Sequence, residues 1–185
     1  METTTLGPGD QSALTVSRLC LGTMLMGGKT PVEESHRMLD RFLEAGGTFL
    51  DTADVYGDGR SEEVLAPWLR AHRDEVVLGT KLRFPVSDPG GGGLAADRVV
   101  RACDASLRRM GVDVIDLYQI HAPDPDVALE ETLEALDGRL AAHEHRAEAQ
   151  AADGECGLIA GAERGRLHAT RPTHRDRSPH RREVG

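Results

Sequence analysis

Four polar side chains that could together move a proton follow three apolar segments of the sequence. Asp51 closes FLD, Tyr56 lies five residues later in VYGDG, Lys81 follows VVLGT and His121 follows VIDLYQI. A phenol is a poor acid near neutral pH, but an ammonium group beside its oxygen favours the phenolate. An aspartate can hold that lysine charged and oriented, and a histidine can hydrogen-bond a substrate oxygen. The set predicts a proton donor facing a carbonyl that is reduced by hydride from a cofactor.

Each of these residues alone is a weak signal. A single lysine or histidine at a strand end is usually structural or faces solvent. Tyr56 could merely cap the fold, and Asp51 could bond neighbouring loop amides. Four chemically matched residues at successive strand ends are harder to attribute to chance, so we interpret them as one site.

Strand-like and helix-like segments alternate over the first 137 residues, and together they would position these side chains. We expect strands at 16–21, 48–51, 76–80 and 114–120, and helices at 31–45, 61–69, 97–110 and 126–136. Repeated strand–helix units imply a parallel sheet, either doubly wound or a (βα)8 barrel. The loop GTMLMGGKT lacks the GxGxxG pattern of a doubly wound dinucleotide fold. In a barrel the carboxyl ends of all strands share one face. Ahead of the first strand, TTTLGPGDQSALTV predicts a short β-hairpin.

Composition and charge exclude several classes of protein. The formal net charge of −9 argues against a general nucleic-acid surface. No run of 18 apolar residues predicts a membrane span, and METTTLGPGD does not resemble a secretion signal. Three distant cysteines without a CxxC pair predict a reduced, cytoplasmic protein.

The composition changes near Gly138. Residues 1–137 hold 13 basic and 24 acidic residues, a net charge of −11, whereas 138–185 hold nine and seven, a net charge of +2. The second segment is rich in Arg, Ala and His, lacks aromatic residues and shows no hydrophobic periodicity. We expect an irregular, disordered tail, although 139–152 could extend the fourth helix. Our hypothesis is that the tail is a frameshifted translation of a GC-rich gene. Resequencing around codon 138 tests this, and an alternate frame without a fifth strand would contradict it.

Two other interpretations of the tail stay open. RPTHRDRSPHRRE could contact nucleic acid or anionic lipid. A zinc site is the second, although the spacing of its ligands fits no known pattern. Its ligands would be His143, His145, Cys156 and His168.

The motifs FLDTADVYGDGRSEEVL, GTK, IDLYQIHAPD and LTVSRLCLGTM resemble those of the aldo-keto reductases, over about residues 4–137. The GRSEE form is similar to bacterial members related to the potassium-channel β subunits. The resemblance implies a (βα)8 barrel that reduces a small carbonyl substrate with NADPH, or in some members NADH. It implies catalytic roles for Asp51, Tyr56, Lys81 and His121, and cofactor contacts at Gly22, Thr23, Met24 and Asp51.

The resemblance stops after Leu136, where the family continues with a fifth strand and, later, its cofactor-holding loops. We therefore expect an α/β fold that is the N-terminal half of a (βα)8 TIM barrel, over 1–137, followed by the tail. Open barrel edges predict self-association, and two copies could complete eight strands. We expect a reductase by family and little or no activity from this chain. The alternative is a non-enzymatic binding or regulatory relative, or a defunct remnant. We expect no metal, nucleic-acid or membrane partner.

Overall fold

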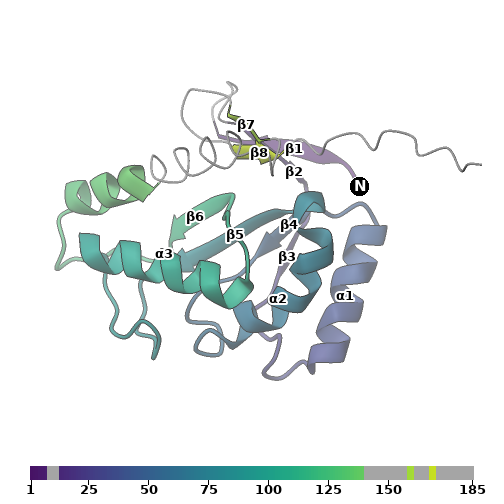
Figure 1. Ribbon diagram of the computed structural model, residues 1–185, viewed down its shortest axis with the longest axis horizontal. Helices are drawn as coiled ribbons and strands as arrows, with labels where there is room; N and C mark the ends of the chain where they lie inside the picture. Colours follow the sequence, from purple (N-terminus) through teal and green to yellow (C-terminus); the bar gives the residue numbers. More distant parts are fainter. Residues whose placement is uncertain (8–12, 140–157, 161–166, 170–185) are drawn as a thin grey trace, which may run out of the picture.

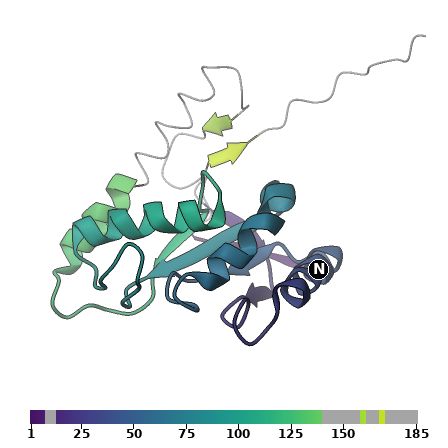
Figure 2. The same cartoon turned by 60° about the horizontal axis from the view of Figure 1, so that its bottom comes forward.

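The computed structural model describes residues 1–7, 13–139, 158–160 and 167–169. Its centre is a parallel four-stranded sheet in the order β3 (Cys20–Gly22), β4 (Phe49–Asp51), β5 (Val77–Leu82) and β6 (Leu117–Ile120). Helices α1 (Val32–Glu44), α2 (Arg60–His72) and α3 (Ala96–Met110) connect successive strands and lie along one face of the sheet (Figures 1 and 2). A further helix follows β6 over residues 129–139. This confirms the α/β class and the partial barrel of four strand–helix units.

The predicted hairpin is present, but the predicted strand 16–21 is wrong as a single element. Strand β1 (Thr3–Leu6) pairs antiparallel with β2 (Leu14–Ser17), and β3 begins separately at Cys20. The Ser17 hydroxyl explains the break. It accepts hydrogen bonds from the Thr48 and Phe49 amides and donates to the Leu19 carbonyl at 2.6 Å. The hairpin therefore ends where its last side chain is tied to the start of β4.

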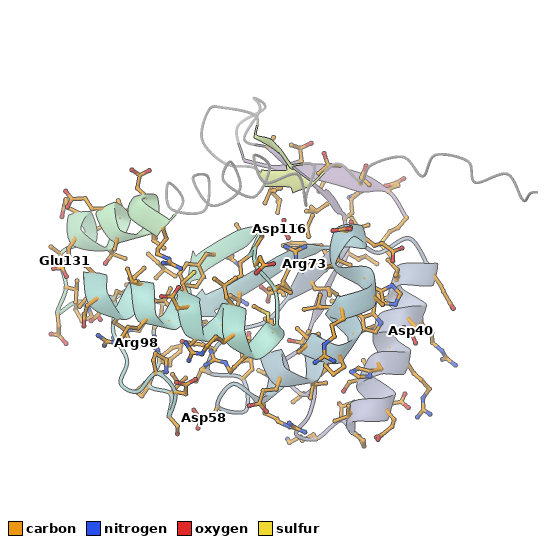
Figure 3. All side chains as sticks on the ribbon, viewed as in Figure 1. Asp40, Asp58, Arg73, Arg98, Asp116 and Glu131 are labelled. Carbon is orange, nitrogen blue, oxygen red and sulfur yellow. The ribbon has the colours of Figure 1, made fainter. Side chains whose placement is uncertain are left out.

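The fourth predicted strand is shorter than 114–120, because side chains replace its first ladder bonds. The Asp116 carboxylate accepts a hydrogen bond from the Leu78 amide at 2.7 Å and from Arg73 at 2.6 Å. Arg73, in the short helix η1 (Arg73–Glu75), also donates to the Val114 carbonyl at 2.9 Å. Figure 3 shows Arg73 and Asp116 facing each other. Regular pairing with β5 then starts at Leu117, the partner of Gly79.

The core lies between the sheet and the helices. Strand residues Leu50 and Leu78 pack there against Leu39 of α1, Leu65 of α2 and Met110 of α3, all fully buried. Each such side chain stabilises the fold by about 1.5–3 kcal/mol relative to exposure. A second, smaller cluster holds α3 and the helix over 129–139 against β5 and β6. The core fixes the spacing of the strands and so of their carboxyl ends.

Little of the predicted tail falls within the described residues. Strands β7 (Leu158–Ala160) and β8 (Leu167–Ala169) form an antiparallel pair. Of the predicted zinc ligands, His168 lies on β8 opposite Ile159. His143, His145 and Cys156, the rest of the predicted disordered tail and the RPTHRDRSPHRRE segment lie outside the described residues. Across the ranges that are described, no helix has the length and apolar character that crossing a bilayer requires. The same ranges contain no group of three or more metal-ligating side chains.

Candidate active site

The side chains predicted to act together meet at the carboxyl edge of the sheet. Asp51 is the last residue of β4, and Lys81 lies near the end of β5. Lys81 Nζ donates to Asp51 Oδ2 at 2.5 Å and to the Thr52 carbonyl at 2.8 Å. The same nitrogen lies 5.3 Å from the centre of the Tyr56 ring. Asp51, Lys81 and Tyr56 are therefore adjacent, with the lysine in the middle.

His121 completes this cluster from the end of β6. Its amide donates to the Leu82 carbonyl at 2.9 Å, which extends the ladder by one residue. Its ring centre lies 5.7 Å from that of Tyr56, edge to face, and 5.1 Å from that of Phe84. Its Nδ1 is buried and has no hydrogen-bond partner among the described residues. The imidazole thus has one buried nitrogen that no described residue satisfies.

The electrostatics favour a neutral His121. Burial, followed by the positive charge of Lys81, lowers the pKa of the imidazole below its ordinary value of 6.5, against a smaller opposite effect of Asp51. A neutral imidazole can donate one hydrogen bond and accept another. Near neutral pH this ring is therefore suited to bonding an uncharged carbonyl oxygen.

Replacing Lys81 by methionine should raise the pKa of His121, because it removes a lowering charge and leaves the Asp51 carboxylate. The measurement is an NMR titration of the imidazole protons, with the His121 signal assigned from a His121→Gln variant. The matched control is Lys29→Met, since Lys29 is the other lysine of the chain and lies exposed in the loop after β3. A His121 midpoint that responds equally to both substitutions would contradict this assignment.

The residues predicted to contact a cofactor differ in how far they are buried. Thr23 is fully buried, and both its amide and its hydroxyl donate to the Asp51 carbonyl, at 3.0 and 3.3 Å. Ser61 of α2 donates to the Thr23 carbonyl at 2.8 Å. Gly22 and Met24 are exposed, and a Cβ added at Gly22 would meet nothing within 4 Å. The end of β3 at Gly22 therefore leaves open space at one edge of the sheet.

Sequence reasoning missed two residues inside the cluster. Gln119 Nε2 lies 3.5 Å from Asp51 Oδ1, at the limit of a hydrogen bond. Cys20 shares a strand face with Gly22, the partner of Asp51, and desolvation followed by the Asp51 charge raises the pKa of its thiol to about 11. Alternation along a strand could have found the first, because Gln119 precedes His121 by two residues and so shares its face.

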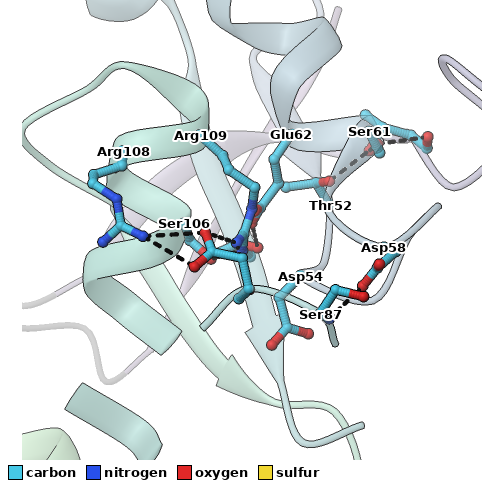
Figure 4. Close-up of polar contacts among 12 residues, drawn as sticks. Thr52, Asp54, Asp58, Ser61, Glu62, Ser87, Ser106, Arg108 and Arg109 are labelled. Atoms are coloured by element: carbon cyan, nitrogen blue, oxygen red, sulfur yellow. Dashed lines mark hydrogen bonds and ion pairs between the residues drawn. The ribbon is translucent and has the colours of Figure 1, made fainter. Parts of the chain in front are cut away.

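Two buried ion pairs behind the Tyr56 loop were also missed. Asp54, two residues before Tyr56, accepts a bond from Arg98 of α3 at 3.0 Å, and these side chains are 0% and 3% exposed. Glu62 of α2 accepts bonds from Arg109 at 2.7 Å and from Thr80 at 2.6 Å. Figure 4 shows Arg109 reaching Glu62. The Asp54 amide also donates to the Lys81 carbonyl at 3.0 Å. These contacts tie the Tyr56 loop to α3 and β5.

Comparison with known proteins identifies the family of the chain. The sequence of residues 18–139 matches the model of the aldo/keto reductase family. The chain is 38% identical over 149 residues to the uncharacterized oxidoreductase YrpG of Bacillus subtilis, a match that covers 74% of this chain and 45% of YrpG. It is 34% identical over 131 residues to a probable voltage-gated potassium channel β subunit of Oryza sativa, covering 69% of this chain and 40% of that protein.

A solved structure gives the same result. The holo form of an aldo-keto reductase from Bacillus halodurans superposes with a TM-score of 0.66 at 34% identity, covering 75% of this chain and 46% of that one. The chain thus spans less than half the length of the relatives it matches. Within that span it belongs to the aldo/keto reductase family.

Proposed function

We propose that this chain carries the proton-transfer site of a nicotinamide-dependent carbonyl reductase, with Tyr56 as the proton donor. One observation supports this most directly: the Lys81 ammonium lies 2.5 Å from Asp51 and 5.3 Å from the Tyr56 ring centre. A positive charge there stabilises the negative charge that develops on a phenol oxygen as its proton leaves. Asp51 holds the lysine in that place.

The other residues then take defined roles. His121, kept neutral by burial and Lys81, donates a hydrogen bond to the oxygen of a small aldehyde or ketone. Gly22, Thr23 and Met24, with Asp51, would line the nicotinamide of NADPH, or of NADH as the second choice. The bound cofactor supplies hydride to the carbonyl carbon. Tyr56 supplies the proton to the carbonyl oxygen, which completes the alcohol.

Binding and turnover of the full chain test this assignment separately. NADPH should bind, as measured by quenching of its fluorescence, and Tyr56→Phe should leave that binding unchanged. The same substitution should lower NADPH-dependent reduction of an aldehyde by about 10²–10⁴-fold, because a positioned proton donor contributes that much. Equal turnover by the variant would exclude Tyr56 as the donor.

A second candidate function is binding or regulation without catalysis, or no function at all in a remnant. Its support is the likeness to the rice channel subunit. Hydride transfer needs closely held geometry, and the described sheet leaves its β3 and β6 edges unpaired beside the site, so we propose that activity of this chain is weak. Failure to quench NADPH fluorescence would favour this candidate over the reductase.

We also propose that the chain is cytoplasmic and associates with copies of itself. The free thiols of Cys20 and Cys103 support a reducing, cytoplasmic location. Strands β3 and β6 each have a strand neighbour on one side only within the described sheet. Unpaired edges of this kind template pairing with another chain, which supports self-association.

A further inference from the structure

Exposed large apolar side chains gather beside the two unpaired sheet edges. Leu19, Met24 and Leu25 flank β3, and Leu129 and Leu133 lie on the helix that follows β6, all between 48% and 63% exposed. Soluble monomers rarely expose apolar side chains in contiguous groups. The two edges therefore resemble two halves of an interface.

Helix α1 adds to the β3 side. His36 of this helix bonds the Val64 carbonyl of α2 at 2.8 Å, so that side of α1 faces α2. Met38 comes two residues later, about 200° around the helix, and is exposed. It thus lies on the side of α1 that faces away from α2. Figure 1 shows α1 at one end of the row of helices, with the helix over 129–139 at the opposite end.

A groove runs beside the other edge. A cavity of about 610 Å³ lies between β6, α3 and the helix over 129–139. Its apolar lining includes Cys103, Ile115, Tyr118, Leu133 and Leu136. In a closed barrel, the next strand and its helix would cover this place beside β6.

We propose that a second copy of this chain covers both edges, with β6 of each copy pairing parallel to β3 of the other to close an eight-stranded barrel. The inference rests on the self-association proposed above and names its partner and geometry. Four strands are half of such a barrel. A twofold axis along the barrel joins both pairs of edges at once, so no edge stays open.

The pairing already present predicts the register of the new pair. One row of partners runs through Gly22, Asp51, Gly79 and Leu117. Gly22 and Asp51 are the last residues of β3 and β4, whereas Leu117 is the first residue of β6. From β3 to β6, the paired residues therefore lie progressively closer to the amino ends of their strands. Eight-stranded barrels of this type close with a shear of about eight residues, of which each copy supplies half. Leu117 should therefore pair with Arg18 on the second copy, about four residues before Gly22.

In this register Gln119 lies beside Cys20 of the second copy. Both side chains point into the barrel, since Gln119 lies against Asp51 and Cys20 shares a strand face with Gly22, the partner of Asp51. Their neighbours Leu21 and Tyr118 pack outward with the helical layer. Inward residues thus meet inward residues, as closure requires.

Closure also changes the candidate active site. The loop after β3, with the exposed Met24 and Leu25, would stand beside the end of β6 of the other copy. It would cover the open side of His121 and Phe84, which already pack together at 5.1 Å. Each site is then completed by side chains of the partner.

Disulfide trapping in the full chain tests the register. In a background with Cys103→Ala and Cys156→Ala, Gln119→Cys should form a covalent dimer with the native Cys20 on mild oxidation. Adding Cys20→Ser should abolish the dimer. Arg70→Cys, on the exposed face of α2, is the matched control and should give no comparable product.

Sedimentation velocity tests the interface without a new thiol. The chain should sediment as a species of twice 20.0 kDa, with a concentration-dependent equilibrium. Leu129→Glu should raise the dimer dissociation constant about tenfold or more, because it puts a charge into an apolar contact. Far-UV circular dichroism checks that this variant keeps its helices.

The outcomes separate this inference from the proposed function. A monomer at all concentrations, or equal trapping at positions 119 and 70, would overturn the second copy as the occupant. Trapping of Leu117→Cys instead of Gln119→Cys would overturn the register. A dimer that fails to quench NADPH fluorescence would support the proposed interface and contradict the proposed reductase function. A monomer that binds NADPH would contradict the interface and support the reductase function.

Discussion

Replacing Arg98 by methionine should lower the free energy of unfolding by about 3–5 kcal/mol near neutral pH, the usual cost of removing one partner of a buried ion pair. Asp54 is 0% exposed, and the Arg98 guanidinium is its counter-charge at 3.0 Å. Arg98 also donates to the Gly91 carbonyl at 3.3 Å. The variant would leave a carboxylate in the protein interior without its cation. Urea denaturation gives the free energy directly.

The loss should shrink as the pH falls. Burial raises the pKa of Asp54 above its ordinary value of 3.8, and Arg98 opposes that shift. Without Arg98, the folded state therefore binds a proton at a pH where the unfolded chain does not. The free energy of unfolding of the variant should rise as pH falls below the folded pKa, and level off below 3.8.

Two further variants isolate the cause of this effect. Asp54→Asn combined with Arg98→Met removes both charges and should recover much of the loss near neutral pH. Arg101→Met breaks an exposed pair with Asp97 on the same helix and should leave the free energy of unfolding nearly unchanged. If the double variant were as unstable as Arg98→Met at every pH, an unpaired Asp54 would not be the reason.

The fold and the chemical cluster were predictable because they depend on local pattern. Apolar runs closed by a polar residue marked the ends of β4, β5 and β6, and parallel pairing brings such ends to one edge. Asp51 and Lys81 could therefore be placed together from their positions alone. The structure places their charged groups 2.5 Å apart.

The ion pairs and one strand boundary were not predictable, because they depend on partners that are distant in sequence. Asp54 and Arg98 are 44 residues apart, and the sequence around either residue does not indicate the other as its partner. Arg98 also sits beside Val99 on the apolar face of α3, where the sequence pattern favours core residues. The end of β2 depends on Thr48, 31 residues after Ser17.

Replacing Lys81 by methionine should lower the turnover number of NADPH-dependent aldehyde reduction by about 10²–10⁴-fold, the range for loss of a general acid's function. The ammonium bonds Asp51 and the Thr52 carbonyl and lies over the Tyr56 ring. Methionine keeps much of the length of the side chain but removes the charge. The Asp51 carboxylate would then face Tyr56 without compensation, and it opposes negative charge on the phenol oxygen.

The change should fall on the turnover number and much less on the Michaelis constant, because the charge matters most as the proton moves. Steady-state kinetics at saturating NADPH separates the two parameters. Lys29→Met is the matched control, since it makes the same substitution in an exposed loop and should retain full activity. Quenching of NADPH fluorescence checks that Lys81→Met still binds the cofactor. A variant with an unchanged turnover number would show that proton transfer does not depend on the ammonium between Asp51 and Tyr56.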